Sequence, residues 1–274
     1  MNIARTIIPA ILICAALVSR PVKGAERIIL PDEIFYYRPA SSALAPEAIW
    51  DNPAAILHDT TVGFQYIGEI KGKSTLKSWG MVSSGNGLGV AYRHLNDFIG
   101  KAYDEYIFAA GSEIVTGFNW GGSYRYIKNG PEYYNRRHFW NLALAIRKSE
   151  AISLAAVFEN LNRGKIEGQK SAVEQRYALS YHLLKIGMIL SVEAVTASGR
   201  SLSDADYHYS LEYFSRRNWQ LFGTIDNSEN YQLGARYSHG AYSYGLQSRF
   251  SHNDGPVSIG LFIEYRPAWA PARK

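Results

Sequence analysis

The sequence predicts an all-β protein, a transmembrane antiparallel β-barrel of about 14 strands with an N-terminal hatch-like segment. Three observations predict this fold. Stretches of about ten residues alternate apolar and polar side chains, short and long connections alternate between them, and an apparent export leader precedes the series. Because strand side chains alternate between two faces, each stretch has one apolar face.

The last alternating stretch shows the pattern most clearly. Val257, Ile259, Leu261, Ile263 and Tyr265 share one face of an extended chain. The opposite face is small or polar apart from one phenylalanine. We expect this strand to pair with the first strand and so close the sheet.

About fourteen candidate strands share this format, each near the ~9–11 residues that a tilted transmembrane strand needs. They are 61–70, 75–83, 87–95, 103–111, 115–126, 138–147, 151–161, 175–183, 186–196, 207–214, 218–225, 231–238, 241–250 and 257–265. The connections after the even-numbered strands are tight, and most of the others are longer. A transmembrane barrel predicts this alternation, with short periplasmic turns and longer outer loops.

The strand faces carry the second part of the prediction. Leu142, Leu144 and Ile146 share one face of 138–147, and Tyr177 and Leu179 share one face of 175–183. Aromatic residues gather near strand ends, as two interfacial girdles require. Periodicity alone does not tell an outward, lipid-facing apolar set from the inward set of a soluble barrel. Export and aromatic placement favour lipid.

Composition agrees with a sheet that carries aromatic girdles. The chain has 20 tyrosines, 24 glycines and 6 tryptophans, and only 19% of its residues are charged. The net charge of +5 and the pI of about 9.1 raise the question of nucleic acid. The basic residues are scattered singly and no nucleic-acid motif is present, so we expect no nucleic-acid partner.

Residues 1–24 have the features of a secretory signal peptide. Arg5 is basic, the stretch from Ile7 to Val18 is apolar, and Gly24 precedes Ala25 at the expected cleavage site. The only cysteine lies within this leader, so the mature chain is expected to have no thiol and no disulfide. We expect export and placement in the outer membrane.

Residues 25–59 do not have the pattern of a barrel wall. Pro31, Pro39, Pro46 and Pro53 interrupt them, and proline has no N–H to donate to a strand ladder. The segment is either a periplasmic tail or packed into the barrel mouth. Because 43–56 is apolar with few charges, burial is favoured. The barrel is expected over 60–266 and a C-terminal tail over 267–274.

Short motifs resemble those of known outer-membrane barrels. Ser258-x-Gly260-x-x-Ile263-x-Tyr265 is similar to their C-terminal assembly signal. The stretch 48–56, AIWDNPAAI, resembles the NPA segment of the FadL and PorV superfamily, and 158–161 (FENL) and 211–213 (LEY) also resemble strands of its members. That superfamily groups fourteen-stranded outer-membrane barrels, including fatty-acid and hydrocarbon transporters and type IX secretion components.

The resemblance implies a hatch that plugs the barrel, with Trp50, Asn52, Pro53 and Ala54 as hatch or gating residues. The Asn52 amide can donate to and accept from wall groups, while Pro53 fixes the chain direction. An ordinary Asn-Pro turn is the alternative.

The inward faces carry charged side chains, which are costly in a narrow barrel unless they are paired or hydrated. The expected lumen charge network consists of Arg125, Arg147, Glu159, Arg176, Glu193, Glu212 and Arg236. Two interpretations stay open. One is an ion-pair network that stiffens the wall, and the other is a conduit for a polar or amphipathic solute.

An enzymatic function is not expected. His208-Tyr209-Ser210 has the His-x-Ser spacing of outer-membrane lipid hydrolases, whose serine needs an imidazole as base. Here Tyr209 belongs to the apolar face with Leu211, so His208 and Ser210 point into the lumen. The histidines show no metal-ligand spacing, and we expect no metal and no cofactor.

The expected function is passage of hydrophobic or amphipathic small molecules across the outer membrane, with the hatch gating the lumen. The alternative is a PorV-like secretion or cell-envelope scaffold that anchors partner proteins. Expected partners are outer-membrane lipid, a hydrophobic small-molecule ligand and, during biogenesis, the barrel assembly machinery.

Overall fold

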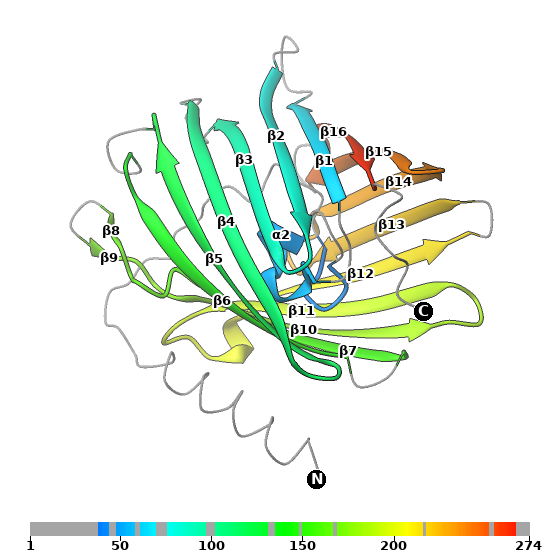
Figure 1. The fold of residues 1–274 in the computed structure, drawn as a ribbon, viewed down its shortest axis with the longest axis horizontal. Helices are drawn as coiled ribbons and strands as arrows, with labels where there is room; N and C mark the ends of the chain where they lie inside the picture. Colours follow the sequence, from blue (N-terminus) through cyan, green and yellow to red (C-terminus); the bar gives the residue numbers. More distant parts are fainter. Residues whose placement is uncertain are drawn as a thin grey trace.

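A computed structural model describes residues 38–43, 48–57, 61–69, 76–96, 102–130, 135–147, 150–166, 169–215, 218–251 and 255–266. The predicted leader (1–24) and the predicted tail (267–274) lie outside these residues. Antiparallel strands form a closed barrel in the order β1-β16-β15-β14-β13-β12-β11-β10-β7-β6-β5-β4-β3-β2 (Figure 1). The all-β antiparallel prediction is therefore confirmed.

The wall strands are β1 (Thr61–Glu69), β2 (Leu76–Gly85), β3 (Leu88–Asn96), β4 (Ala102–Val115), β5 (Phe118–Lys128), β6 (His138–Arg147), β7 (Ile152–Glu159), β10 (Glu174–Leu183), β11 (Met188–Ala197), β12 (Asp206–Phe214), β13 (Trp219–Asp226), β14 (Tyr231–His239), β15 (Tyr242–Ser251) and β16 (Gly255–Tyr265). β1 pairs with β16 from Val62↔Tyr265 to Glu69↔Ser258. The last strand thus meets the first.

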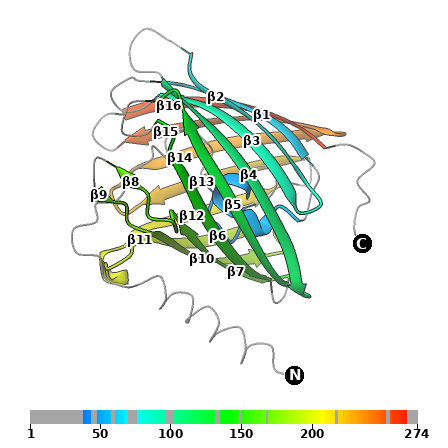
Figure 2. The same cartoon turned by 60° about the vertical axis from the view of Figure 1, so that its left-hand side comes forward.

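Some predicted details differ from the structure. The fifth strand begins at Phe118 rather than at Val115, because Gly117 takes a positive φ in the β4–β5 turn. A small hairpin, β8 (Lys165–Ile166) with β9 (Gln169–Lys170), lies within the predicted connection 162–174 (Figures 1 and 2). The connection between β13 and β14 covers only 227–230, so the alternation of short and long connections weakens toward the C-terminus.

The two ends of the barrel differ. The β2–β3, β4–β5, β10–β11 and β14–β15 turns lie at one end, called here the short-turn end. The β2–β3 turn uses Asn86 and Gly87, both with positive φ, as a two-residue hairpin prefers. The longer β5–β6, β7–β10 and β11–β12 connections lie at the opposite, long-loop end, the last of them with the 3-10 helix η3 (Leu202–Asp204).

The apolar faces of the strands point outward. Leu154, Leu179, Leu211, Leu233 and Leu261, from five different strands, are between 42 and 53% exposed. Their neighbours along the strands are buried, as Ser210 and Glu212 show beside Leu211. This arrangement reverses that of a soluble barrel, in which the apolar set would fill the interior.

Aromatic side chains form outward-facing belts at both ends. At the long-loop end, the ring centroids of Trp79 and Tyr92 lie 5.1 Å apart, and those of Tyr124 and Trp140 lie 4.8 Å apart. At the short-turn end, Trp219 and Tyr237 are 4.9 Å apart, and Tyr242 and Tyr265 are 5.1 Å apart. Such belts mark the two interfaces of a bilayer. Among the described residues, no helix has the length and hydropathy to cross a membrane.

Candidate functional site

Residues 38–43 and 48–57 lie inside the ring of strands, where α2 (Ala48–Asp51) and η2 (Pro53–Ala55) are drawn in blue (Figure 1). The described apolar residues of 43–56 are buried, as the sequence predicted. Ile49 and Ile56 pack with Val82 and Ile107 of the wall. Ala54 packs in a second cluster with alanines of β6, β7 and β10. We call residues 38–43 and 48–57 the plug. The plug fills the lumen on the side formed by β3 to β12.

Asn52 shapes the turn of the plug. Its side-chain oxygen accepts a hydrogen bond from the Ala54 N–H at 3.0 Å and caps η2, while Pro53 occupies the first helical position. Its amide nitrogen donates to the Ala40 carbonyl at 2.8 Å. Both partners belong to the plug, so the predicted contact of Asn52 with wall groups is wrong. Asn52 ties the two ends of the plug to each other.

Two wall glycines allow the plug backbone to approach. A Cβ at Gly111 would lie 2.8 Å from the Pro53 carbonyl oxygen, and a Cβ at Gly121 would collide with the Pro53 carbonyl group. Both glycines face inward near the β4–β5 turn. Pro53 and Ala54 therefore sit against bare backbone at the short-turn end.

Hydrogen bonds and an ion pair attach the start of the plug to β7, β10, β11 and β12. Arg38 pairs with Glu212 at 2.6 Å, and the Ala40 N–H donates to Glu193 at 2.9 Å. Ser153 donates to the Ser41 carbonyl at 2.8 Å, and the hydroxyls of Ser41 and Ser180 lie 2.6 Å apart. Since Arg38, Glu193 and Glu212 are almost fully buried, these contacts are shielded from water.

A chain of alternating charges runs across the wall beside the plug. Glu105 pairs with Arg93 and lies 3.0 Å from Arg125. Arg125 and Arg176 approach Glu159 at 3.7 and 3.5 Å, and Arg176 lies 3.1 Å from Glu193. We call this the ion-pair chain; its members are Arg93, Glu105, Arg125, Glu159, Arg176 and Glu193.

The plug contacts the ion-pair chain at two of its arginines, Arg93 and Arg176. The Arg93 guanidinium stands over the Trp50 ring, 5.5 Å from its centroid. Arg176 lies 3.6 Å from Asp51. The predicted hatch residue Trp50 therefore contacts the ion-pair chain directly, through its cation–π contact with Arg93.

The seven predicted lumen charges fall into three groups. Arg125, Glu159, Arg176 and Glu193 belong to the ion-pair chain, and Glu212 holds the plug through Arg38. Arg236 pairs with Glu264 elsewhere. Among the described residues, no carboxylate forms an ion pair with Arg147, which is exposed at the short-turn end. Arg147 therefore does not belong to the network.

Five members of these contacts were not among the seven predicted charges: Arg38, Asp51, Arg93, Glu105 and Glu264. Glu105 shares a strand face with Tyr103 and Ile107, so strand periodicity places it in the lumen. Arg38 and Asp51 lie in the irregular segment, where no periodicity gives their direction.

The β13–β16 side of the lumen is filled without the described part of the plug. The rings of Phe222 and Phe262 lie directly over Gly234 and Gly245 and contact each other in one cluster. Arg236 pairs with Glu264 and stands 5.8 Å from the Phe262 ring centroid. Among the described residues, these wall side chains fill this side.

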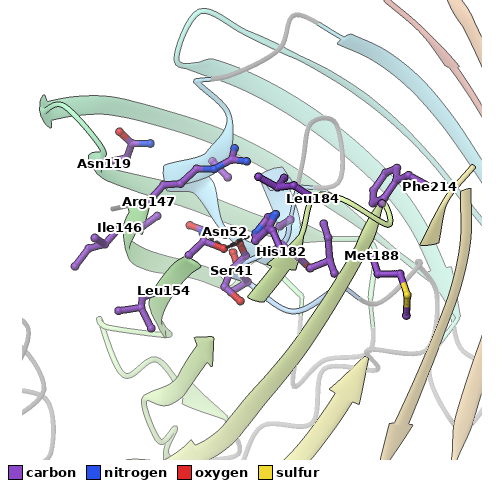
Figure 3. A pocket seen from close by; sticks show the side chains of 18 residues that line it. Ser41, Asn52, Asn119, Ile146, Arg147, Leu154, His182, Leu184, Met188 and Phe214 are labelled. Carbon is purple, nitrogen blue, oxygen red and sulfur yellow. Dashed lines mark hydrogen bonds between the residues drawn. The ribbon is translucent and has the colours of Figure 1, made fainter. Parts of the chain in front are cut away.

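A cavity of about 350 Å³ lies between the plug and the wall at the short-turn end (Figure 3). Ser41 and Asn52 line it from the plug, and Arg147 and His182 line it from β6 and β10. Its remaining lining is largely apolar and includes Ile146, Leu154, Leu184, Met188 and Phe214. A cavity with this mixture suits an amphipathic ligand.

The described parts of the chain contain no group of three or more His, Cys, Asp or Glu residues placed to hold a metal ion. His208 lies on the inward face with Ser210, while Tyr209 between them is 53% exposed.

Comparisons with known proteins give fold-level likeness only. No family model matches the chain, and no curated protein matches it. A mutant porin of Rhodopseudomonas blastica is 10% identical, with a TM-score of 0.46 over 75% of this chain and 99% of that one. The KdgM porin in complex with disordered oligogalacturonate is 11% identical, with a TM-score of 0.44 over 75% and 99%. Likeness at this level carries no functional inference.

Proposed function

We propose that this chain is a fourteen-stranded outer-membrane β-barrel with the plug as its hatch. The outward leucines and the two aromatic belts support a wall in contact with lipid. The polar and charged residues point into the lumen, and they would be unfavourable on the lipid-facing side of the wall. The short-turn end then faces the periplasm, and the long-loop end faces the outside of the cell.

Within this barrel, the proposed function is passage of hydrophobic or amphipathic small molecules between the plug and the wall. The observation that carries it is the cavity beside the plug, which joins an apolar lining to the exposed Arg147. An amphipathic molecule needs both kinds of surface. The plug gates the route because it forms one wall of the cavity.

A cell-envelope scaffold is the second candidate, and the ion-pair chain favours it. Buried charges joined across six strands stiffen the wall and obstruct the lumen, and a rigid barrel suits an anchor for partner proteins. In this case the cavity is a gap in the packing rather than a route.

A flux measurement on the purified full chain in liposomes tests the passage. Ala145 lines the cavity, so Ala145→Phe should reduce the influx of a fluorescent amphipathic probe several-fold. Ala110→Phe is the matched control, because Ala110 is exposed on the outer face. Heat-modifiable migration of each variant in detergent confirms that the barrel is folded. Equal flux through all three proteins would refute passage through the cavity.

Deletion in the producing cell separates the two candidates. Passage predicts slower uptake of hydrophobic compounds and an unchanged set of surface proteins. Unchanged uptake together with loss of a surface or secreted protein would eliminate the passage and support the scaffold.

A further inference from the structure

A second cavity, of about 320 Å³, lies on the outer face of the wall across β6, β7, β10, β11 and β12. It shares two lining residues, Ile146 and Leu154, with the cavity beside the plug. Figure 3 shows both side chains pointing away from the side on which Arg147, Asn52 and His182 lie. The two cavities therefore adjoin at the short-turn end, one on each face of the β6–β7 pair.

The register of the strands explains the outer groove. One row of paired residues alternates large and small side chains, and its members are Leu144, Ala156, Tyr177, Ala194 and Tyr207. The next row toward the short-turn end holds the larger Ile146, Leu154, Leu179 and Val192. Ala156 and Ala194 are buried between these neighbours, so the outer face is hollowed at both alanines. The hollow is lined by apolar side chains throughout.

The polar end of the site lies one residue pair further along the same ladder. Arg147 pairs with Ser153 in the β6–β7 register, directly after the Ile146↔Leu154 pair. His182 on β10 places its Nε2 3.1 Å from the Ser153 hydroxyl. Arg147 is exposed, and among the described residues no carboxylate neutralises it.

We propose that the two cavities together bind one phospholipid of the periplasmic leaflet, with an acyl chain in the outer groove and the phosphate at Arg147. This proposal rests on the proposed membrane placement and names the amphipathic class that the site takes. An arginine fork matches phosphate oxygens in a bidentate way. Ser153 and His182 line the same cavity, but the Ser153 hydroxyl donates its hydrogen to the Ser41 carbonyl, so Arg147 is the group that holds the phosphate. Because the short-turn end faces the periplasm, Arg147 lies at the level of the periplasmic leaflet, which consists of phospholipid.

The test is retention of phosphatidylglycerol by the full-length barrel in mixed detergent micelles, measured by native mass spectrometry over a lipid titration. Wild type should hold one molecule. Arg147→Gln should weaken retention at least tenfold, whereas Arg200→Gln, an exposed arginine at the long-loop end, should leave it unchanged. Ala156→Leu with Ala194→Leu fills the groove and should also weaken retention.

Further ligands identify what is bound. Phosphatidylcholine with the same chains should be held more weakly, and inorganic phosphate alone should not compete. Equal retention by Arg147→Gln and wild type would overturn the proposal. So would competition by phosphate alone, or displacement of the lipid by an equimolar single-chain fatty acid.

Failure of this proposal can be told from failure of the proposed function. If phosphatidylglycerol is not retained while Ala145→Phe still slows probe influx into liposomes, the lipid site is refuted and passage stands. If the chain shows no heat-modifiable migration and does not insert into liposomes, the membrane placement itself is wrong.

Discussion

The two sides of the lumen are closed in different ways. On the β3–β12 side, the plug is held by hydrogen bonds, by buried ion pairs and by close contact with two glycines. On the β13–β16 side, Phe222 and Phe262 lie over glycines and one ion pair completes the filling. Among the described residues, the first closure joins two separate parts of the chain, and the second consists of wall side chains. We therefore expect the first closure to open without unfolding of the barrel, because its residues lie outside the wall strands.

The largest expected difference between the sides comes from removing their central arginines. Arg176→Met leaves Asp51, Glu159 and Glu193 without their shared guanidinium, which should lower the free energy of unfolding by about 3–5 kcal/mol. The same variant should expose the plug to added protease. Arg236→Met removes a single pair and should destabilise the barrel while the plug stays protected. A urea titration in detergent with limited proteolysis measures both effects, and plug exposure in Arg236→Met but not in Arg176→Met would contradict the comparison.

Removing an aromatic ring tests the wall-based closure. Phe262→Ala empties the space over Gly245 and should lower the free energy of unfolding by about 3 kcal/mol. The plug amides should exchange faster only to the extent that the lower global stability explains, with no additional local opening of the plug. Faster local exchange at Ala40 or Ala54 would show that the two sides are coupled.

A side chain at the glycine contact should push the plug away. Gly121→Val places atoms where the Pro53 carbonyl group lies, and overpacking of this kind costs about 1–3 kcal/mol. Gly122→Val is the matched control, since a Cβ there meets only the Asn141 carbonyl oxygen at 3.4 Å. Plug hydrogen exchange should rise in the first variant only. The close-approach argument fails if both variants behave alike.

The smallest expected effect is at Asn52. Asn52→Ala removes the cap of η2 and the bond to Ala40, and should cost about 1 kcal/mol. Asn52→Ser keeps an acceptor for the Ala54 N–H and loses only the bond to Ala40, so it should cost less. Exchange of the Ala54 amide measures the difference, and equal exchange in the two variants would argue against a capping role.

Strand faces were predictable from the sequence because alternation needs no knowledge of the neighbours. The exposed leucines and the inward Arg125, Glu159 and Glu193 follow from period two alone. Outward rather than inward apolar faces were favoured by the placement of aromatic residues, and the exposure of the leucines agrees.

The pairing of the charges was not predictable. Arg125 on β5 meets Glu159 on β7 across the intervening strand, which depends on how the registers of three strands add up. The partner of Asn52 depends on how an irregular segment folds back on itself, and no periodicity describes that. Arg147 likewise lies outside the network because it sits near the short-turn end of β6, and the sequence alone does not give that position relative to the other charges.

A reversible disulfide between the plug and the wall tests most directly the central claim that the plug gates passage. The hydroxyls of Ser41 and Ser180 are 2.6 Å apart, so Ser41→Cys with Ser180→Cys is placed to form a disulfide, in a Cys14→Ser background that leaves no other thiol. Influx of the amphipathic probe into liposomes is then measured on the oxidised protein and again after reduction. If the plug gates passage, influx is low in the oxidised protein and returns to the wild-type rate on reduction. The same influx in both states, with the disulfide verified by mass spectrometry, would contradict gating by the plug.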